Sequence, residues 1–71
     1  MKRISVQSSN VASIGYDAQA GVLEVEFLNG GVYQYFQVDP QIYKAFLAAA
    51  SKGKFLHRVL KGSYSFKKVR G

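Results

Sequence analysis

The sequence predicts an α+β domain, with a three-stranded antiparallel β-meander followed by one or two helices packed on one face and a short, extended, basic C-terminal segment. Residues 22–27 alternate between apolar and polar side chains, as a half-buried strand does, and an Asn-Gly pair soon after them marks a hairpin. Asp39-Pro40 is typical of a helix start. The 71 residues, 48% of them hydrophobic, suit a single domain over residues 1–71.

The strands of the meander are predicted at residues 11–17, 22–27 and 32–37. The first strand has low strand propensity because it contains Ala, Ser and Gly. Its prediction is supported by the clear alternation of the second strand, which follows it after a short turn. In the second strand the side chains expected to face the core are Leu23, Val25 and Phe27, and those expected to face solvent are Glu24 and Glu26. In the third strand the aromatic side chains expected in the core are Tyr33 and Tyr35, and the one expected on the polar side is Phe36.

Two registers are possible for the hairpin between the second and third strands. A two-residue turn at 29–30 would pair Val25 with Gln34 and place an amide on the apolar face. A three-residue loop at 28–30, with glycine as the bulge residue, pairs Val25 with Tyr33 instead. Burying an amide without partners costs roughly 1 to 3 kcal/mol, so we predict the three-residue loop.

The helices are predicted from capping signals and apolar spacing. Asp39 caps the first turn, Pro40 occupies the first helical position, and Gly53 ends or kinks the helix. Its apolar stripe consists of Ile42, Tyr43, Phe46, Leu47 and Ala50. A second short helix is predicted over residues 54–61, and residues 64–67 alternate as a short final strand or extended segment. The inward side chains of the second helix are Phe55, Leu56, Val59 and Leu60.

Charge is distributed unevenly along the chain. All four acidic residues lie within the first 39 positions together with two cations, so this part carries −2. From Pro40 onward there are eight cations and no acid, so this part carries +8, and the sum is the net charge of +6. A surface of one sign attracts polyanions, and we therefore expect a nucleic-acid partner. A solvated basic face without a specific partner is the alternative.

The cations of the second predicted helix have the spacing of one helical face. Lys54, Arg58 and Lys61 stand at i, i+4 and i+7, which places three cations within reach of a phosphate backbone. Such contacts hold nucleic acid without reading its sequence. The residues predicted to bind nucleic acid are Lys52, Lys54, Arg58, Lys61, Lys67, Lys68 and Arg70, with His57 and Tyr64 as minor contributors.

No catalytic, metal or cofactor site is predicted. The chain has no cysteine and a single histidine, so the three or four ligands of a zinc site are lacking. Glu24 and Glu26 share a strand face, and nothing near them in the sequence would separate their pKa values into an acid and a base. No apolar run is long enough to span a bilayer and the first residues are too polar for a signal peptide, so we expect a cytoplasmic protein.

Two functions of other classes compete with nucleic-acid binding. One is a protein-interaction module or homo-oligomer that uses an exposed sheet edge or a surface aromatic such as Phe36. The other is docking to an anionic membrane through residues 54–61, which the absence of tryptophan and the need for Phe55 and Val59 in the core disfavour.

Several short patterns, read in order along the chain, resemble the KTSC domain, a family named after the C-terminus of some lysyl-tRNA synthetases. The residues that carry the resemblance are Ser8-Ser9-Asn10, Ile14-Gly15-Tyr16-Asp17, Leu23-x-Val25-x-Phe27, Asn29-Gly30, Tyr33-x-Tyr35, Val38-x-Pro40 and Ser51-Lys52-Gly53-x-Phe55. The resemblance extends from about Val6 to Val69. It implies a nucleic-acid-binding role, with RNA favoured over DNA and tRNA as the suggested partner, and it supplies no catalytic residue.

Overall fold

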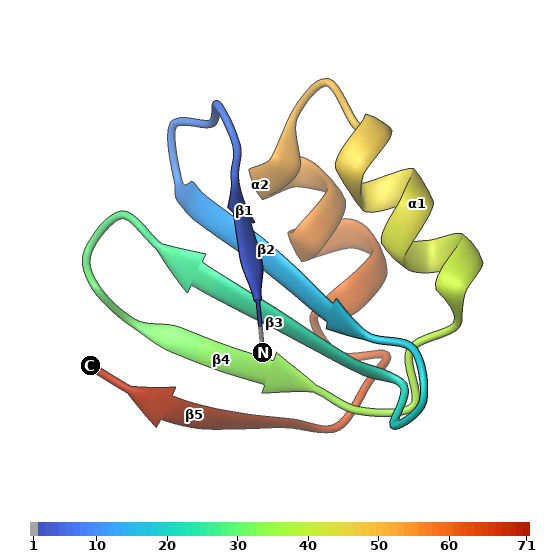
Figure 1. Cartoon of the computed structure of the whole chain (residues 1–71). Coiled ribbons are helices and arrows are strands. Elements are labelled where there is room, and N and C mark those ends of the chain that lie inside the picture. Colours follow the sequence, from blue (N-terminus) through green and yellow to red (C-terminus); the bar gives the residue numbers. More distant parts are fainter. Residues whose placement is uncertain (1) are drawn as a thin grey trace.

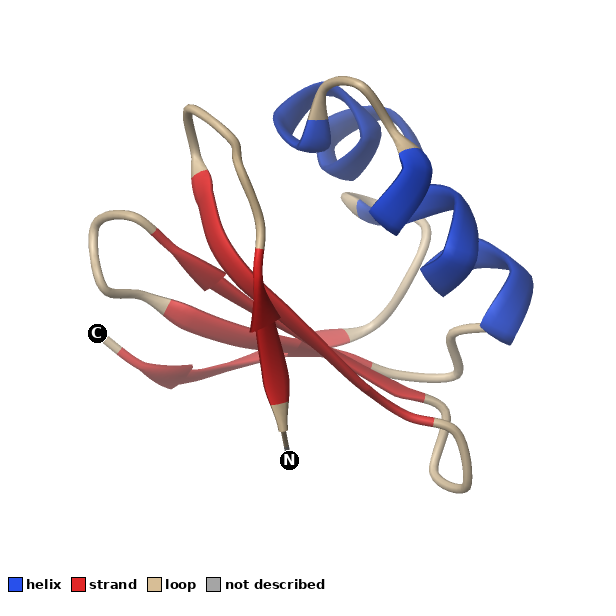
Figure 2. Cartoon of the chain, turned by 45° about the horizontal axis from the view of Figure 1, so that its top comes forward, coloured by secondary structure: helices blue, strands red, loops and turns tan. Residues whose placement is uncertain are grey.

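A computed structural model describes residues 2–71 as one antiparallel sheet with helices on one side (Figures 1 and 2). The strands are β1 (Arg3–Ser5), β2 (Val11–Asp17), β3 (Val22–Phe27), β4 (Val32–Tyr35) and β5 (Phe66–Arg70). The helical segments are α1 (Pro40–Ala48), α2 (Lys52–Phe55) and the π-helical turn η1 (Leu56–Leu60), which continues α2. Each strand pairs with its neighbours in chain order, from β1 to β5.

The meander is confirmed, and the prediction of only three strands is wrong. β2 and β3 have the predicted bounds, and two further strands extend the sheet at its edges. β1 is only three residues long, and β5 lies over residues 66–70 rather than 64–67. Every residue of β5 is exposed, so the strand is held mainly by its pairing with β4 and carries no burial pattern that sequence periodicity could detect.

The predicted hairpin register is confirmed. Val25 pairs with Tyr33 and Glu24 pairs with Gln34, whose side-chain amide donates to Glu24 Oε1 over 2.8 Å. Gly30 adopts a positive φ of 95°, as the bulge position of a three-residue loop requires. The third strand is shorter than predicted: it ends at Tyr35, because Gln37 has a φ of 58° and turns the chain toward α1.

The start of α1 is confirmed and its predicted end is wrong. The Asp39 side chain accepts from the backbone N–H of Gln41 over 2.9 Å, and Pro40 is the first helical residue. The helix stops at Ala48, and Gly53 lies inside α2 instead of ending α1. A Cβ at Gly53 would lie 2.8 Å from Asn10 Oδ1, so glycine allows α2 to approach the β1–β2 connection.

The core lies between the sheet and the helices. Its fully buried members come from the helix-facing side of β2 and β3 and from both helical segments: Val11, Ile14, Leu23, Val25, Phe46 and Leu60. Tyr16 of β2 stacks on Tyr43 of α1 with ring centroids 4.7 Å apart, and its hydroxyl donates to the carbonyl of Val38. Phe46 stacks on Phe55 at 5.3 Å, which joins α1 to α2.

Two tyrosines of this core make the stability of the protein sensitive to alkaline pH. Burial raises the pKa of Tyr35 above its ordinary value of 10.0, with a smaller contribution from Tyr33. Partial burial raises the pKa of Tyr16, and the carboxylates of Asp39 and Asp17 add to the effect. In the unfolded chain both phenols ionise near pH 10, whereas the folded chain holds these protons to higher pH.

The resulting stability is full below about pH 10 and is lost as pH rises through the folded pKa values. Thermal denaturation followed by circular dichroism should therefore show a melting temperature that falls above about pH 10. Tyr16→Phe should reduce this fall without removing it, because Tyr35 remains. An alkaline fall as large in Tyr16→Phe and in Tyr35→Phe as in the parent protein would contradict the assignment.

Candidate nucleic-acid interface

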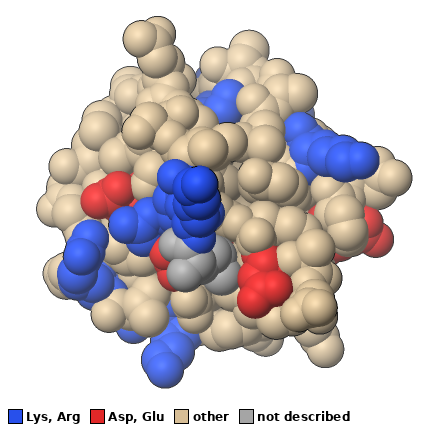
Figure 3. Space-filling model, in the orientation of Figure 1, with Lys and Arg blue, Asp and Glu red and all other residues tan. Residues whose placement is uncertain are grey.

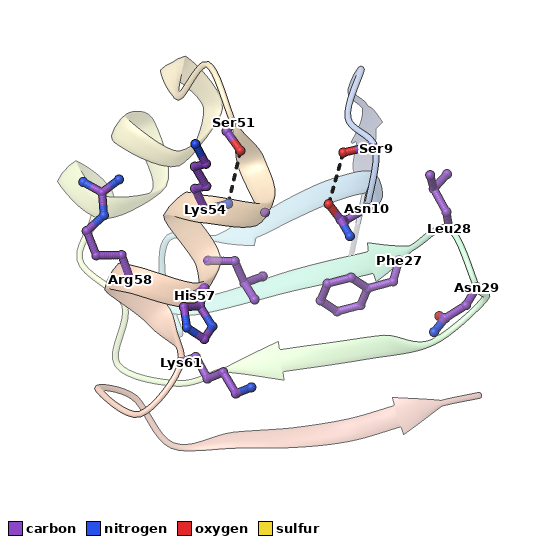
Figure 4. A pocket seen from close by; sticks show the side chains of 12 residues that line it. Ser9, Asn10, Phe27, Leu28, Asn29, Ser51, Lys54, His57, Arg58 and Lys61 are labelled. Carbon is purple, nitrogen blue, oxygen red and sulfur yellow. Dashed lines mark hydrogen bonds between the residues drawn. The ribbon is translucent and has the colours of Figure 1, made fainter.

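An open groove of about 970 Å³ lies between the second helical segment and the loops at one end of the sheet (Figure 4). One wall comes from α2 and η1, with Lys54, His57, Arg58 and Lys61. The opposite wall comes from the β1–β2 connection and the β3–β4 hairpin, with Ser9, Asn10, Phe27, Leu28 and Asn29. The floor includes the apolar side chain of Leu56, so a ligand in the groove would meet cations on one side and polar or aromatic groups on the other.

The loop wall of the groove is built by side-chain hydrogen bonds to backbone. Ser8 Oγ accepts from the backbone N–H groups of Asn10 and Val11 at 3.1 and 3.2 Å. The carbonyl of Asn10 accepts from Leu28 N–H over 2.9 Å, and this bond ties the β1–β2 connection to the β3–β4 hairpin. Ser8-Ser9-Asn10 thus forms a turn that the Ser8 side chain caps.

The motif Ser51-Lys52-Gly53-x-Phe55 positions the cationic wall. Ser51 Oγ caps α2 by accepting from Lys54 N–H over 3.3 Å, and Phe55 stacks on α1. Lys52 is only 9% exposed, and its ammonium donates to the Ala49 carbonyl over 2.6 Å at the end of α1. The structure therefore places Lys52 apart from the exposed cations, with its charge satisfying the carbonyl end of a helix.

The predicted cationic helix face exists, with a different helical geometry. The helix spans residues 52–60, and Lys61 N–H donates to the Leu56 carbonyl over 2.8 Å, an i to i−5 bond of a π-turn. Lys54, His57, Arg58 and Lys61 are all exposed and all line the groove. Figure 4 shows them fanned along one wall, with His57 and Lys61 nearer to the strands.

The cations of β5 divide between the two faces of the sheet. Lys68 pairs with Tyr33 on the helix-facing side, and its ammonium lies 6.0 Å from the Tyr33 ring centroid. Lys67 pairs with Gln34 on the opposite face. Arg70 also lies on the opposite face, where its guanidinium is 3.6 Å from Glu26. Lys67 and Arg70 therefore do not share the surface that Lys54, Arg58 and Lys61 form.

The face opposite the helices has mixed charge. Glu24 accepts from Arg3 Nη1 over 2.6 Å, and Glu26 lies within 3.9 Å of Arg3 and 3.6 Å of Arg70. On the face seen in Figure 3, basic side chains stand in several separate groups with acidic side chains between them. The groove differs, because no Asp or Glu is among the described residues that line it.

Tyr64 is the remaining predicted binding residue, and it is partly buried and packs against the core. The loop wall of the groove was not predicted from the sequence, and neither was the exposure of Phe66, an aromatic residue that, like Tyr64, lies between cations in the sequence. Both depend on which strands lie at the edges of the sheet. Within residues 2–71, no group of three or more His, Cys, Asp or Glu side chains could hold a metal ion, and none of the helices is long and apolar enough to cross a membrane.

Comparisons with known proteins give one family. The model of the KTSC domain matches residues 7–64. A crystal structure of a KTSC domain protein from Yersinia pestis superposes with a TM-score of 0.93, at 40% identity, over 96% of each chain. An uncharacterised protein of Stutzerimonas stutzeri is 44% identical over 61 residues, which are 86% of each chain. A lysine–tRNA ligase of Nostoc punctiforme is 30% identical over 63 residues, which are 89% of this chain and 11% of the ligase.

Proposed function

This chain belongs to the KTSC domain family, and we propose that it is a non-catalytic, cytoplasmic RNA-binding domain whose groove beside α2 and η1 holds the phosphate backbone. Lys54, Arg58 and Lys61 neutralise phosphates, and His57 adds a polar contact. The observation that carries the proposal is the separation of charge between the two sides of the sheet. The groove is lined by cations without a carboxylate among its described residues, while Glu24 and Glu26 are paired with arginines on the far side.

This separation matters because an unpaired cation is available to a ligand, whereas one paired with a carboxylate is not. Lysine and arginine side chains grouped in a concave surface raise the local concentration of a polyanion and speed its association. Such contacts do not distinguish one base sequence from another. We therefore expect binding that is steeply dependent on salt and weakly dependent on sequence.

Transfer RNA is the first partner to test. Lysine–tRNA ligases of Nostoc punctiforme and Trichormus variabilis contain a segment similar to this chain, at 30% and 29% identity. In both, the similar segment is 11% of the ligase length, so the likeness does not extend to the rest of the enzyme.

Association with a second copy through a sheet edge is the competing function, and the composition of the edge disfavours it. The exposed edge strand β5 carries Lys67, Lys68 and Arg70. Charged side chains on an edge strand oppose its pairing with another chain. We therefore rank RNA above self-association.

The test is fluorescence anisotropy with labelled tRNA, single-stranded RNA and duplex RNA at two salt concentrations. The triple variant Lys54→Glu, Arg58→Glu, Lys61→Glu should weaken binding to each probe that the parent binds. If the variant loses three phosphate contacts, the slope of log affinity against log salt should flatten by roughly 2 to 3, at 0.7 to 0.9 per contact. Circular dichroism checks that the variant remains folded.

The matched control is the triple variant Lys2→Glu, Lys44→Glu, Lys67→Glu, whose exposed lysines do not line the groove. Three reversals change the charge by six in either variant, so both go from +6 to 0. We expect the control to retain most of the affinity. Equal losses of affinity in the two variants would assign binding to net charge alone. The proposal would be overturned if the parent protein bound none of the probes.

A further inference from the structure

Three aromatic side chains form a row across the helix-facing side of the sheet, one from each of three adjacent strands. Phe27 of β3 meets Tyr33 of β4 edge to face, with ring centroids 5.6 Å apart. Tyr33 in turn lies 5.9 Å from Phe66 of β5. Phe66 also packs 5.8 Å from Tyr35, which is buried beneath the row.

The outer end of this row is open to solvent. Phe66 is 57% exposed, and all residues of β5 are exposed because no helix covers this edge of the sheet (Figure 1). A second cavity of about 370 Å³ lies over the row and is lined by Phe27, Tyr33, Tyr35 and Phe66, together with Leu56 and Lys61. It shares Phe27, Asn29, Leu56 and Lys61 with the groove, so the two concave surfaces adjoin.

Cations stand beside the aromatic rings. Lys61 lines both cavities, and Lys68 holds its ammonium 6.0 Å from the Tyr33 ring centroid. In Figure 4 the Phe27 ring points into the groove from the strand side, and His57 and Lys61 lie on the helix side. An exposed ring next to phosphate-binding groups is complementary to a nucleotide whose base is unpaired and whose phosphate is charged.

We propose that Phe66, supported by Tyr33 and Phe27, stacks on unpaired bases, so that the RNA held by this protein is single-stranded at the site. The inference rests on the proposed function, because the groove cations bind the backbone next to the stacked base. A base inside a duplex is already stacked on its neighbours and cannot reach Phe66. Single-stranded RNA, or the unpaired loops of tRNA, is therefore the favoured substrate class.

The test compares three labelled probes of equal length: single-stranded RNA, the same strand with abasic sites in place of its bases, and the duplex. Phe66→Ala should weaken binding of the single strand roughly five- to a hundred-fold, the range that corresponds to one lost base–aromatic stack. It should leave the abasic strand, the duplex and the salt slope unchanged, because the cations remain. Phe66→Tyr, which keeps an aromatic ring at this position, should bind the single strand as tightly as the parent does. The matched control is Val69→Ala, which truncates another apolar side chain of β5 that is 46% exposed.

If Phe66→Ala bound single-stranded RNA as tightly as Val69→Ala does, the stacking assignment would be overturned. The proposed function would still be upheld if the groove variant had abolished binding. An equal loss on the abasic probe would also overturn the stacking assignment, since no base is present there to stack. A parent protein that sediments as a dimer, and that Phe66→Ala converts to a monomer with unchanged RNA affinity, would assign the aromatic row to self-association instead.

Discussion

Phe46→Ala should remove most of the stability of this protein. The Phe46 side chain is part of the core and is the largest of the fully buried side chains. Truncation of a buried phenylalanine to alanine costs about 3 to 5 kcal/mol, because transfer energy is lost and a cavity is left. At about 0.05 to 0.15 kcal/mol per residue, a chain of this length has a free energy of unfolding of only about 4 to 11 kcal/mol. At the middle of both ranges, about 4 of about 7.5 kcal/mol, the variant loses more than half of its free energy of unfolding.

The effect should reach the candidate site, because Phe46 also holds the cationic wall in place. Its ring stacks on Phe55 at 5.3 Å, and Phe55 belongs to the helix that carries Lys54. Urea denaturation followed by circular dichroism gives the loss of stability. Phe46→Leu, which keeps most of the volume, should cost about 1.5 kcal/mol or less.

The exposed Phe66 provides the opposite control. Since its side chain is 57% exposed, Phe66→Ala should change stability far less than Phe46→Ala. Equal losses of stability in the two alanine variants would show that the packing described for Phe46 is wrong.

The parts of the fold that could be predicted depend on residues close together in sequence. The register of the β3–β4 hairpin follows from one local choice, whether Tyr33 or Gln34 lies opposite Val25, and the cost of burying an amide decides it. The start of α1 follows from Asp39 and Pro40, which act within a single turn. These signals need no knowledge of the remaining chain.

The parts that could not be predicted depend on contacts between distant segments. β5 has no buried residue, and it is a strand only because β4 offers it a free edge. Lys52 has the sequence context of a surface cation, and it is buried because the end of α1 presents a carbonyl to its ammonium. No sequence motif predicts the π-turn of η1.

The candidate site was predicted in part for the same reason. The helical spacing of Lys54, Arg58 and Lys61 places them along one wall, and this local pattern was sufficient. The alternation of a strand separates Lys67 from Lys68, but only the pairing of β5 with β4 says which of the two faces the helices. The net charge of the chain therefore predicted a larger basic surface than the structure has. The sheet topology decides which cations are available to a ligand.

Gly15→Ala should be the most damaging of the small-residue substitutions on the sheet. Arg3, Gly15 and Glu24 lie in one row across β1, β2 and β3, and the Arg3 side chain crosses Gly15 to donate to Glu24 over 2.6 Å. A Cβ at position 15 would lie 2.7 Å from the Lys2 carbonyl oxygen and 2.8 Å from Arg3 Cγ. Because one of these atoms belongs to the backbone, the clash cannot be relieved by a rotamer change alone.

We expect Gly15→Ala to destabilise the protein by about 3 kcal/mol, the upper end of the range for overpacking, and to loosen β1. Amide hydrogen exchange should become faster in β1 and at the Val6 N–H, which donates to the Ala12 carbonyl over 3.1 Å, while the β3–β4 ladder changes less. In an Arg3→Ala background the cost of Gly15→Ala should fall without vanishing, because the Lys2 carbonyl remains. If Gly15→Ala lowered the free energy of unfolding by only a few tenths of a kcal/mol, or if amide exchange became faster evenly over the sheet, β1 would not need a glycine at position 15. The same glycine that lowers the strand propensity of residues 11–17 would then have no compensating role, whereas the close approach of Arg3 predicts that this glycine makes the pairing of β1 with β2 possible.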